Sequence, residues 1–128
     1  MKFQRSIFLL FILLFGKTVT AQSFEGVWKG TSLCQVKNSP CHDETVVYHI
    51  SKDTTGKTYQ MQASKIVNGK EQDMGTLSLT YDDKQKVFVS VDSARNARWE
   101  FKLTGNAMKG TLMVKGDLFR IVDVKKEN

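Results

Sequence analysis

The chain has 128 residues and a formal net charge of +6, and its length is typical of a single small domain. Its charges alternate in sign, with no block of five or more like charges and no basic stretch interleaved with aromatic residues. This pattern argues against a nucleic-acid-binding surface, so we expect no nucleic-acid partner.

The chain begins with the layout of a secretory signal peptide. Lys2 and Arg5 provide a positive start, Ile7–Phe15 is an unbroken apolar run, and residues 19–21 (Val-Thr-Ala) form a small-residue cleavage pattern. The apolar run is about half the ~20 residues that a membrane-spanning helix needs. We therefore predict a signal peptide over residues 1–21 and one secreted or periplasmic domain over residues 22–128, without stable membrane insertion; an uncleaved anchor is the alternative.

Cleavage after Ala21 would remove Lys2, Arg5 and Lys17, so the net charge of the domain falls from +6 to about +3. The basic character of the whole chain therefore belongs largely to the signal peptide.

The chain has two cysteines, Cys34 and Cys41. Small exported domains often add a disulfide to a modest core, and export places these thiols in an oxidising compartment. We predict that they pair, which stabilises the fold by roughly 2–3 kcal/mol in the chain-entropy description. A redox or metal-binding pair is the competing interpretation, although six intervening residues do not match the usual CxxC spacing.

The rest of the chain reads as short strands separated by turns. Alternating or β-branched segments predict eight strands, and no window has a sustained helical period. Asn68-Gly69 predicts a two-residue hairpin because both residues tolerate positive φ. The predicted strands cover residues 24–33, 44–51, 58–67, 74–81, 87–92, 97–103, 108–114 and 118–124.

Connections this short allow only antiparallel neighbours. Eight antiparallel strands in sequence order most simply close into an up-and-down β-barrel, which removes exposed sheet edges. A two-sheet β-sandwich is the second possibility.

The early Gly26-Val27-Trp28 segment, followed by about seven more strands, resembles the G-x-W start of lipocalin-like (calycin-like) barrels. The resemblance implies that Trp28 closes one end of the barrel and packs against an arginine on the last strand, for which Arg120 is the candidate. The chain is shorter than typical lipocalins and has no T-D-Y motif in its middle. The resemblance therefore does not by itself imply a spacious cavity.

At this size the chain is more similar to compact calycin-like barrels exported by bacteria, some of which inhibit lysozymes or metalloproteases. It also resembles exported bacterial proteins of unassigned activity that share a W-x-G-x-S/T-x-C … P-C-x-D-E-x-V-x-Y pattern. The counterparts here are Trp28, Gly30, Ser32, Cys34, Pro40, Cys41, Asp43, Glu44, Val46 or Val47, and Tyr48.

His42, Asp43 and Glu44 form the most chemically active-looking cluster. Imidazole and carboxylates bind zinc and similar metals, so the three are weak candidates for a metal site. A structural interpretation is favoured, in which a carboxylate binds backbone amides of the loop. His49 lies seven residues from His42, an odd separation that places the two on opposite faces of a regular strand. We expect His49 to be exposed or hydrogen-bonded.

No catalytic motif is present: there is no G-x-S-x-G segment, no glycine-rich phosphate loop and no cysteine outside the predicted disulfide. The adjacent Asp82 and Asp83 lie in a predicted turn. We therefore expect a non-enzymatic protein without a cofactor.

Trp99 and Phe101 are predicted to face the core. Met61, Met74, Met108 and Met113 either line a soft apolar cavity or fill gaps in the core, the second role being favoured. We expect a monomeric binding module for a small apolar or amphipathic ligand, held at the end opposite Trp28. The alternative is an inhibitor or interaction protein whose partner is a secreted enzyme.

Overall fold

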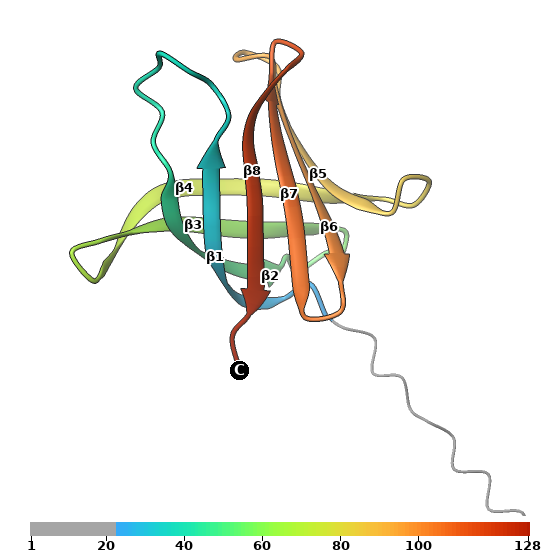
Figure 1. Ribbon diagram of the computed structural model, residues 1–128. Coiled ribbons are helices and arrows are strands. Elements are labelled where there is room, and N and C mark those ends of the chain that lie inside the picture. Colours follow the sequence, from blue (N-terminus) through green and yellow to red (C-terminus); the bar gives the residue numbers. More distant parts are fainter. Residues whose placement is uncertain (1–22) are drawn as a thin grey trace, which may run out of the picture.

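Eight antiparallel strands follow one another and close into a barrel (Figure 1). The structure, a computed structural model, describes residues 23–128, so the predicted signal peptide over residues 1–21 lies outside the described residues. The strands are β1 (Gly26–Cys34), β2 (Glu44–Lys52), β3 (Thr58–Val67), β4 (Lys70–Asp82), β5 (Val87–Asp92), β6 (Ala97–Thr104), β7 (Ala107–Val114) and β8 (Asp117–Lys126). The prediction of an eight-stranded up-and-down barrel is confirmed, and the sandwich alternative is wrong.

Among residues 23–128 no helix has the length and apolarity needed to cross a membrane.

Closure of the barrel depends on β8 returning to β1. The two strands pair antiparallel from Trp28 opposite Lys126 to Cys34 opposite Arg120. Every other strand pairs with its neighbours in the sequence. Alternate residues therefore point inward around the whole barrel.

Turn chemistry sets several strand boundaries. Asn68 and Gly69 have φ values of 52° and 76°, as the predicted tight hairpin requires. This turn lets β4 begin at Lys70, whereas the sequence pattern predicted a start at Met74. Residues 70–73 are polar and exposed, so they lack the alternation of a half-buried strand, yet they pair with β3 because the hairpin continues its register.

The core fills the end of the barrel around Trp28, which is fully buried. Phe24, predicted as the start of the first strand, lies before β1 and closes this end instead. Its ring stacks on Phe88 with centroids 3.6 Å apart and meets Tyr59 edge-on at 5.1 Å. Its carbonyl oxygen accepts a hydrogen bond of 3.1 Å from Nε1 of Trp28. The aromatic contacts and this hydrogen bond together close the end of the barrel around Trp28.

The expected packing of Arg120 on Trp28 is wrong. The cation over the indole is Lys126, whose Nζ lies 5.7 Å from the ring centroid. The reason is register: Lys126 is opposite Trp28 on β8, whereas Arg120 is opposite Cys34, six residues further along. At about 3.3 Å per strand residue, this separation places Arg120 near the other end of the barrel.

The predicted Cys34–Cys41 disulfide is present and closes the loop between β1 and β2. This loop, with Pro40 outside any strand, rises above the upper end of the barrel (Figure 1). Oδ1 of Asp43 accepts a 2.8 Å hydrogen bond from the backbone N–H of Cys34. The carboxylate thus binds the backbone at the end of β1, where the loop begins, which agrees with the structural interpretation of the His-Asp-Glu cluster.

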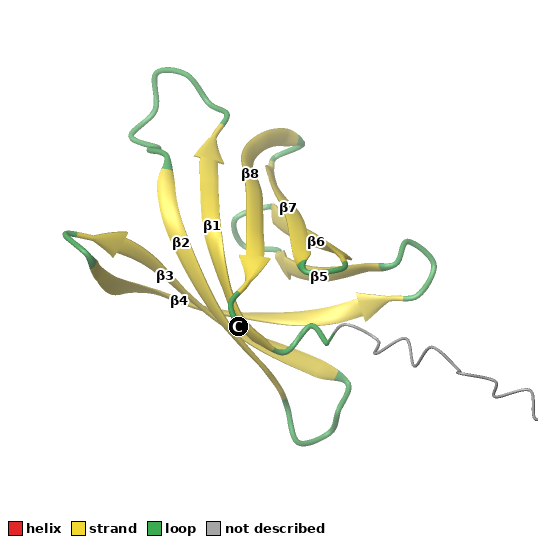
Figure 2. Ribbon diagram, turned by 60° about the horizontal axis from the view of Figure 1, so that its bottom comes forward, coloured by secondary structure: helices red, strands yellow, loops and turns green. Residues whose placement is uncertain are grey.

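Two neighbouring strands of the barrel, β4 and β5, are hydrogen-bonded over only a short distance. β3 and β4 pair along their length, from Thr58 opposite Thr80 to Val67 opposite Lys70. β4 and β5 pair only where Thr80–Asp82 meets Val87–Val89. Figure 2 shows β4 continuing with β3 toward their hairpin while β5 leaves with β6.

Candidate functional site

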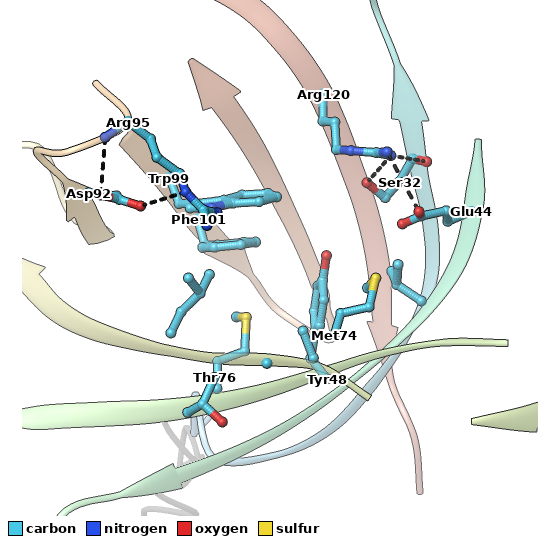
Figure 3. A pocket seen from close by; sticks show the side chains of 15 residues that line it. Ser32, Glu44, Tyr48, Met74, Thr76, Asp92, Arg95, Trp99, Phe101 and Arg120 are labelled. Carbon is cyan, nitrogen blue, oxygen red and sulfur yellow. Dashed lines mark hydrogen bonds and ion pairs between the residues drawn. The ribbon is translucent and has the colours of Figure 1, made fainter. Parts of the chain in front are cut away.

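A cavity of about 470 Å³ lies inside the barrel at the end opposite Trp28. Its apolar lining comes from side chains that alternation directs inward, namely Val46, Met61, Ala63, Leu77, Trp99 and Phe101. Polar residues lie at its rim in two groups: Ser32, Glu44, Tyr48 and Arg120 on one side, and Asp92 and Arg95 on the other (Figure 3). Strand ends from β1, β2, β5 and β8 therefore meet around one opening.

Arg120 is the centre of the first polar group. Its Nη1 donates to the backbone oxygen of Ser32 at 3.3 Å and to Oγ of Ser32 at 3.2 Å. Its Nη2 lies 3.6 Å from Oε1 of Glu44, and both side chains are largely buried, at 13% and 19% exposure. A guanidinium carries five N–H donors, so these contacts leave donors available toward the cavity.

Tyr48 lies below this pair and points its hydroxyl into the cavity (Figure 3). The residue is 3% exposed. Burial raises the pKa of the Tyr48 phenol well above its usual range; Arg120 opposes this shift and Glu44 adds to it. Tyr48 is therefore a neutral hydroxyl facing the cavity, able both to donate and to accept.

The second polar group is looser. Nε of Arg95 lies 3.7 Å from Oδ2 of Asp92, and the Arg95 side chain is 85% exposed. An exposed pair of this kind contributes little to stability. Arg95 is thus free to adjust at the rim.

Each group has one arginine and one carboxylate, so its charges cancel within the group. The rim consequently offers both donors and acceptors without a net charge. A neutral group that both donates and accepts hydrogen bonds, such as an amide or a hydroxyl, matches this arrangement better than a simple anion or cation.

The apolar wall of the cavity consists partly of aromatic rings and partly of flexible methionine side chains. Trp99 and Phe101 stack with centroids 5.7 Å apart and an interplanar angle of 7°. Their core-facing orientation was predicted; that Trp99 also lines a cavity was not. Met74 lines the cavity, Met108 is buried in the core, and Met61 does both.

The residues of the weak metal candidate do not converge. His42 is exposed in the loop, Asp43 binds the Cys34 amide, and Glu44 faces Arg120. Within residues 23–128 no group of three His, Cys, Asp or Glu side chains is placed to hold a metal ion.

His49 lies on the outer face of β2, where its Nε2 is 2.8 Å from Oε1 of Glu71. The expectation of an exposed or hydrogen-bonded His49 is confirmed.

Sequence reasoning did not identify Ser32, Tyr48, Asp92 or Arg95 as site residues. Part of the signal was present, because Tyr48 shares the inward face of β2 with Val46 and Ile50, and a polar group on an apolar face is informative. Asp92 ends β5 and Arg95 lies in the turn after it, where an ordinary turn sequence carries no comparable signal.

Comparisons of the chain with models of protein families, with curated proteins and with solved structures find no significant match.

Proposed function

We propose that this protein is an exported binding module that holds a small amphipathic ligand in the cavity. The observation that carries the proposal is the cavity itself: about 470 Å³, apolar inside and polar at one rim. Cavities of roughly 300–1,000 Å³ with a few convergent polar groups are typical of small-molecule sites.

The topology and the disulfide support the remaining parts of the proposal. An eight-stranded up-and-down barrel with an internal cavity is compatible with a lipocalin-like protein. The Cys34–Cys41 disulfide is consistent with an oxidising compartment outside the cytoplasm.

The ligand's orientation follows from the lining. Its apolar part, a ring or a short chain, lies against Trp99 and Met61, because Trp28 and Phe24 fill the barrel below and exclude a long tail. Its polar part lies between Arg120, Glu44 and the Tyr48 hydroxyl and exchanges neutral hydrogen bonds with them.

The proposal is tested with the neutral amphipathic dye N-phenyl-1-naphthylamine, whose fluorescence rises in apolar surroundings. We expect saturable binding to wild type at one dye per chain. Ala63→Phe places a ring in the cavity and should weaken binding at least tenfold, since the space for the dye is lost. Circular dichroism checks that the variant remains folded.

Thr45→Phe is the matched control, because Thr45 is exposed on the outer face of β2. It adds the same ring outside the barrel and should leave dye affinity unchanged. Absence of saturable dye binding, or equal weakening by the two variants, would refute a ligand site in the cavity.

A second candidate function rests on the stapled loop between β1 and β2. Residues 35–43 protrude beyond the barrel and are held by the disulfide and by Asp43. An ordered protruding loop suits an inhibitor of a secreted enzyme. Wild type used as bait in culture medium should then capture an enzyme that a variant with Val36–Asn38 replaced by glycines does not; capture of no enzyme removes this candidate.

A further inference from the structure

The unpaired edge of β4 is the one long stretch of free strand backbone among residues 23–128. β4 pairs with β3 from Lys70 to Thr80, but with β5 only from Thr80 to Asp82. The β5-facing side of Met74–Leu79 therefore lacks a neighbouring strand. Backbone groups on such an edge are a template for another strand.

The sequence of this edge does not protect it. Residues 74–79 read Met-Gly-Thr-Leu-Ser-Leu, without a charge or a proline. Natural edges are usually blocked by such residues. The charges of β4 lie instead at its ends, as Lys70, Glu71 and Asp73 near the hairpin and Asp82 beside β5. The charges thus flank the stretch, and only Asp73 reaches into it, since its Oδ1 accepts a 2.8 Å hydrogen bond from the backbone N–H of Gly75. The amides of residues 76–79 that face away from β3 remain open.

The face of the sheet is uncovered at this edge. A Cβ added to Gly75 would meet no atom within 4 Å, and Met74 is 43% exposed. Gly75 has φ of 113°, where the pairing of β3 with β4 shifts by one residue. This bulge lies at the position where β4 borders the cavity.

The cavity adjoins the same edge. Residues 74–77 line it from β4, and Asp92 lines it from the diverging end of β5 (Figure 3). A strand added along β4 would direct alternate side chains inward, to the level of Trp99 and Tyr48. Main-chain pairing and an apolar side-chain site then act together, as in known cases of strand addition.

We propose that the β4 edge, residues 74–79, binds an extended peptide segment of a partner protein as an additional strand, with one apolar side chain of that peptide entering the cavity. Unpaired amides and carbonyls select an extended backbone, which a small apolar molecule cannot satisfy. This inference uses the cavity of the proposed function and adds a macromolecular partner to it.

The test begins with a phage-displayed library of random nonapeptides selected on the wild-type protein. The best peptide is made with one backbone N-methyl group at each position in turn. Because only alternate amides of a paired strand face its neighbour, methylation should weaken binding roughly tenfold or more at every second central position and little at the others. No enriched peptide, or no alternation, would overturn the proposal.

Amide hydrogen exchange measured by NMR provides a readout without mutation. In the free protein, the amides of residues 76–79 that face away from β3 should exchange rapidly, and peptide binding should slow them at least tenfold. Peptide binding that protects amides elsewhere, and not these, contradicts the assignment of the edge.

Thr76→Lys adds a charge to the exposed edge, and Thr31→Lys adds one at an exposed position that pairs with a strand on both sides. The first should weaken peptide binding and the second should not. If ultracentrifugation finds a wild-type dimer that Thr76→Lys converts to a monomer, the edge is occupied by a second copy and the partner-peptide proposal is wrong.

The two proposals can fail separately. N-phenyl-1-naphthylamine binding without peptide binding keeps the proposed function and refutes the strand addition. Peptide binding with the predicted alternation, but without dye binding, supports the strand addition and refutes the proposed function.

Discussion

Gly30 shows how a single residue permits the barrel to close. A Cβ at this position would overlap the backbone oxygen of Asp123 and lie 2.8 Å from Cα of Val124 on β8. Backbone atoms cannot move aside as the end of a flexible side chain can. The β1–β8 ladder therefore depends on glycine here for space, and not for an unusual φ.

Gly30→Ala should lower the free energy of unfolding by about 3 kcal/mol, the upper part of the range for overpacking. Thr31→Ala, at the next and outward-facing position, should change it by less than about 0.5 kcal/mol. Urea denaturation measures both. A Gly30→Ala protein as stable as Thr31→Ala would show that β1 and β8 do not approach closely at this point.

Asp53 organises the turn between β2 and β3. Its carboxylate accepts hydrogen bonds from the hydroxyls of Thr58 and Thr55 and from the backbone N–H groups of Thr55 and Gly56. These bonds, above all the one from Thr58, lower the pKa of Asp53 from 3.8 to about 2. The carboxyl group is thus more acidic in the folded state than in the unfolded chain.

The stabilisation from a lowered pKa is complete above the unfolded value and is lost as the pH falls through the folded value. The advantage of wild type over Asp53→Asn should therefore be constant above about pH 5 and decrease between about pH 4 and pH 2. Urea unfolding across this range measures it. Asp83→Asn, at a carboxylate that accepts no hydrogen bond within the described residues, is the control; a wild-type advantage that grows on acidification would contradict the assignment.

At the scale of elements, the disulfide and the loop it closes lie outside the core. The buried residues gather around Trp28, Met61 and Phe101, whereas Cys34 and Cys41 lie at the upper end beside solvent. The disulfide should therefore act on the unfolded chain more than on core packing.

Replacing both cysteines with serine should lower the free energy of unfolding by about 2.5 kcal/mol, the chain-entropy value for so short a loop, and leave the far-UV circular dichroism of the barrel unchanged. Ser39→Ala, inside the same loop, is a control for local contacts, since Oγ of Ser39 accepts a hydrogen bond from the backbone N–H of Cys41. Loss of strand content in the double variant would mean that the loop organises the barrel.

The strands themselves were largely predictable, and the two errors have clear causes. Phe24 fits the alternation of β1 and was therefore predicted to belong to it, but it lies before the strand and closes the barrel end. The sequence cannot separate these two roles, because both require an apolar side chain. The start of β4 was missed because residues 70–73 are polar on both faces and their pairing is imposed by the Asn68-Gly69 turn.

At the scale of the whole molecule, the two ends of the described chain meet at the closed end of the barrel. The backbone N–H of Glu127 donates to the oxygen of Val27 at 2.8 Å, and Nζ of Lys126 donates to the oxygen of Ser23 at 2.8 Å. Adjacent ends make a chain suited to circular permutation.

A permutant that joins residue 128 to residue 23 through a short Gly-Ser linker, opened between Gly105 and Asn106, should fold and unfold cooperatively. The cut lies in a turn and leaves all eight strands intact. A second permutant, opened between Val122 and Asp123, interrupts β8 and should not fold. Circular dichroism with thermal unfolding distinguishes them, and equal behaviour of the two would show that β8 need not be continuous.

By itself, the sequence determined the local structure: strands from alternation, turns from Asn-Gly and similar pairs, the order of neighbours from short connections, and the disulfide from two cysteines behind a predicted signal peptide. These depend on residues close together in the chain. The tertiary structure alone decided what lies around the cavity, since the contact of Arg120 with Ser32 joins residues 88 positions apart through the β1–β8 register. A shift of this register would move Arg120 relative to Trp28 without changing the alternation of either strand. For the same reason, only the closed barrel reveals that β4 and β5 separate and leave an unpaired edge beside the cavity.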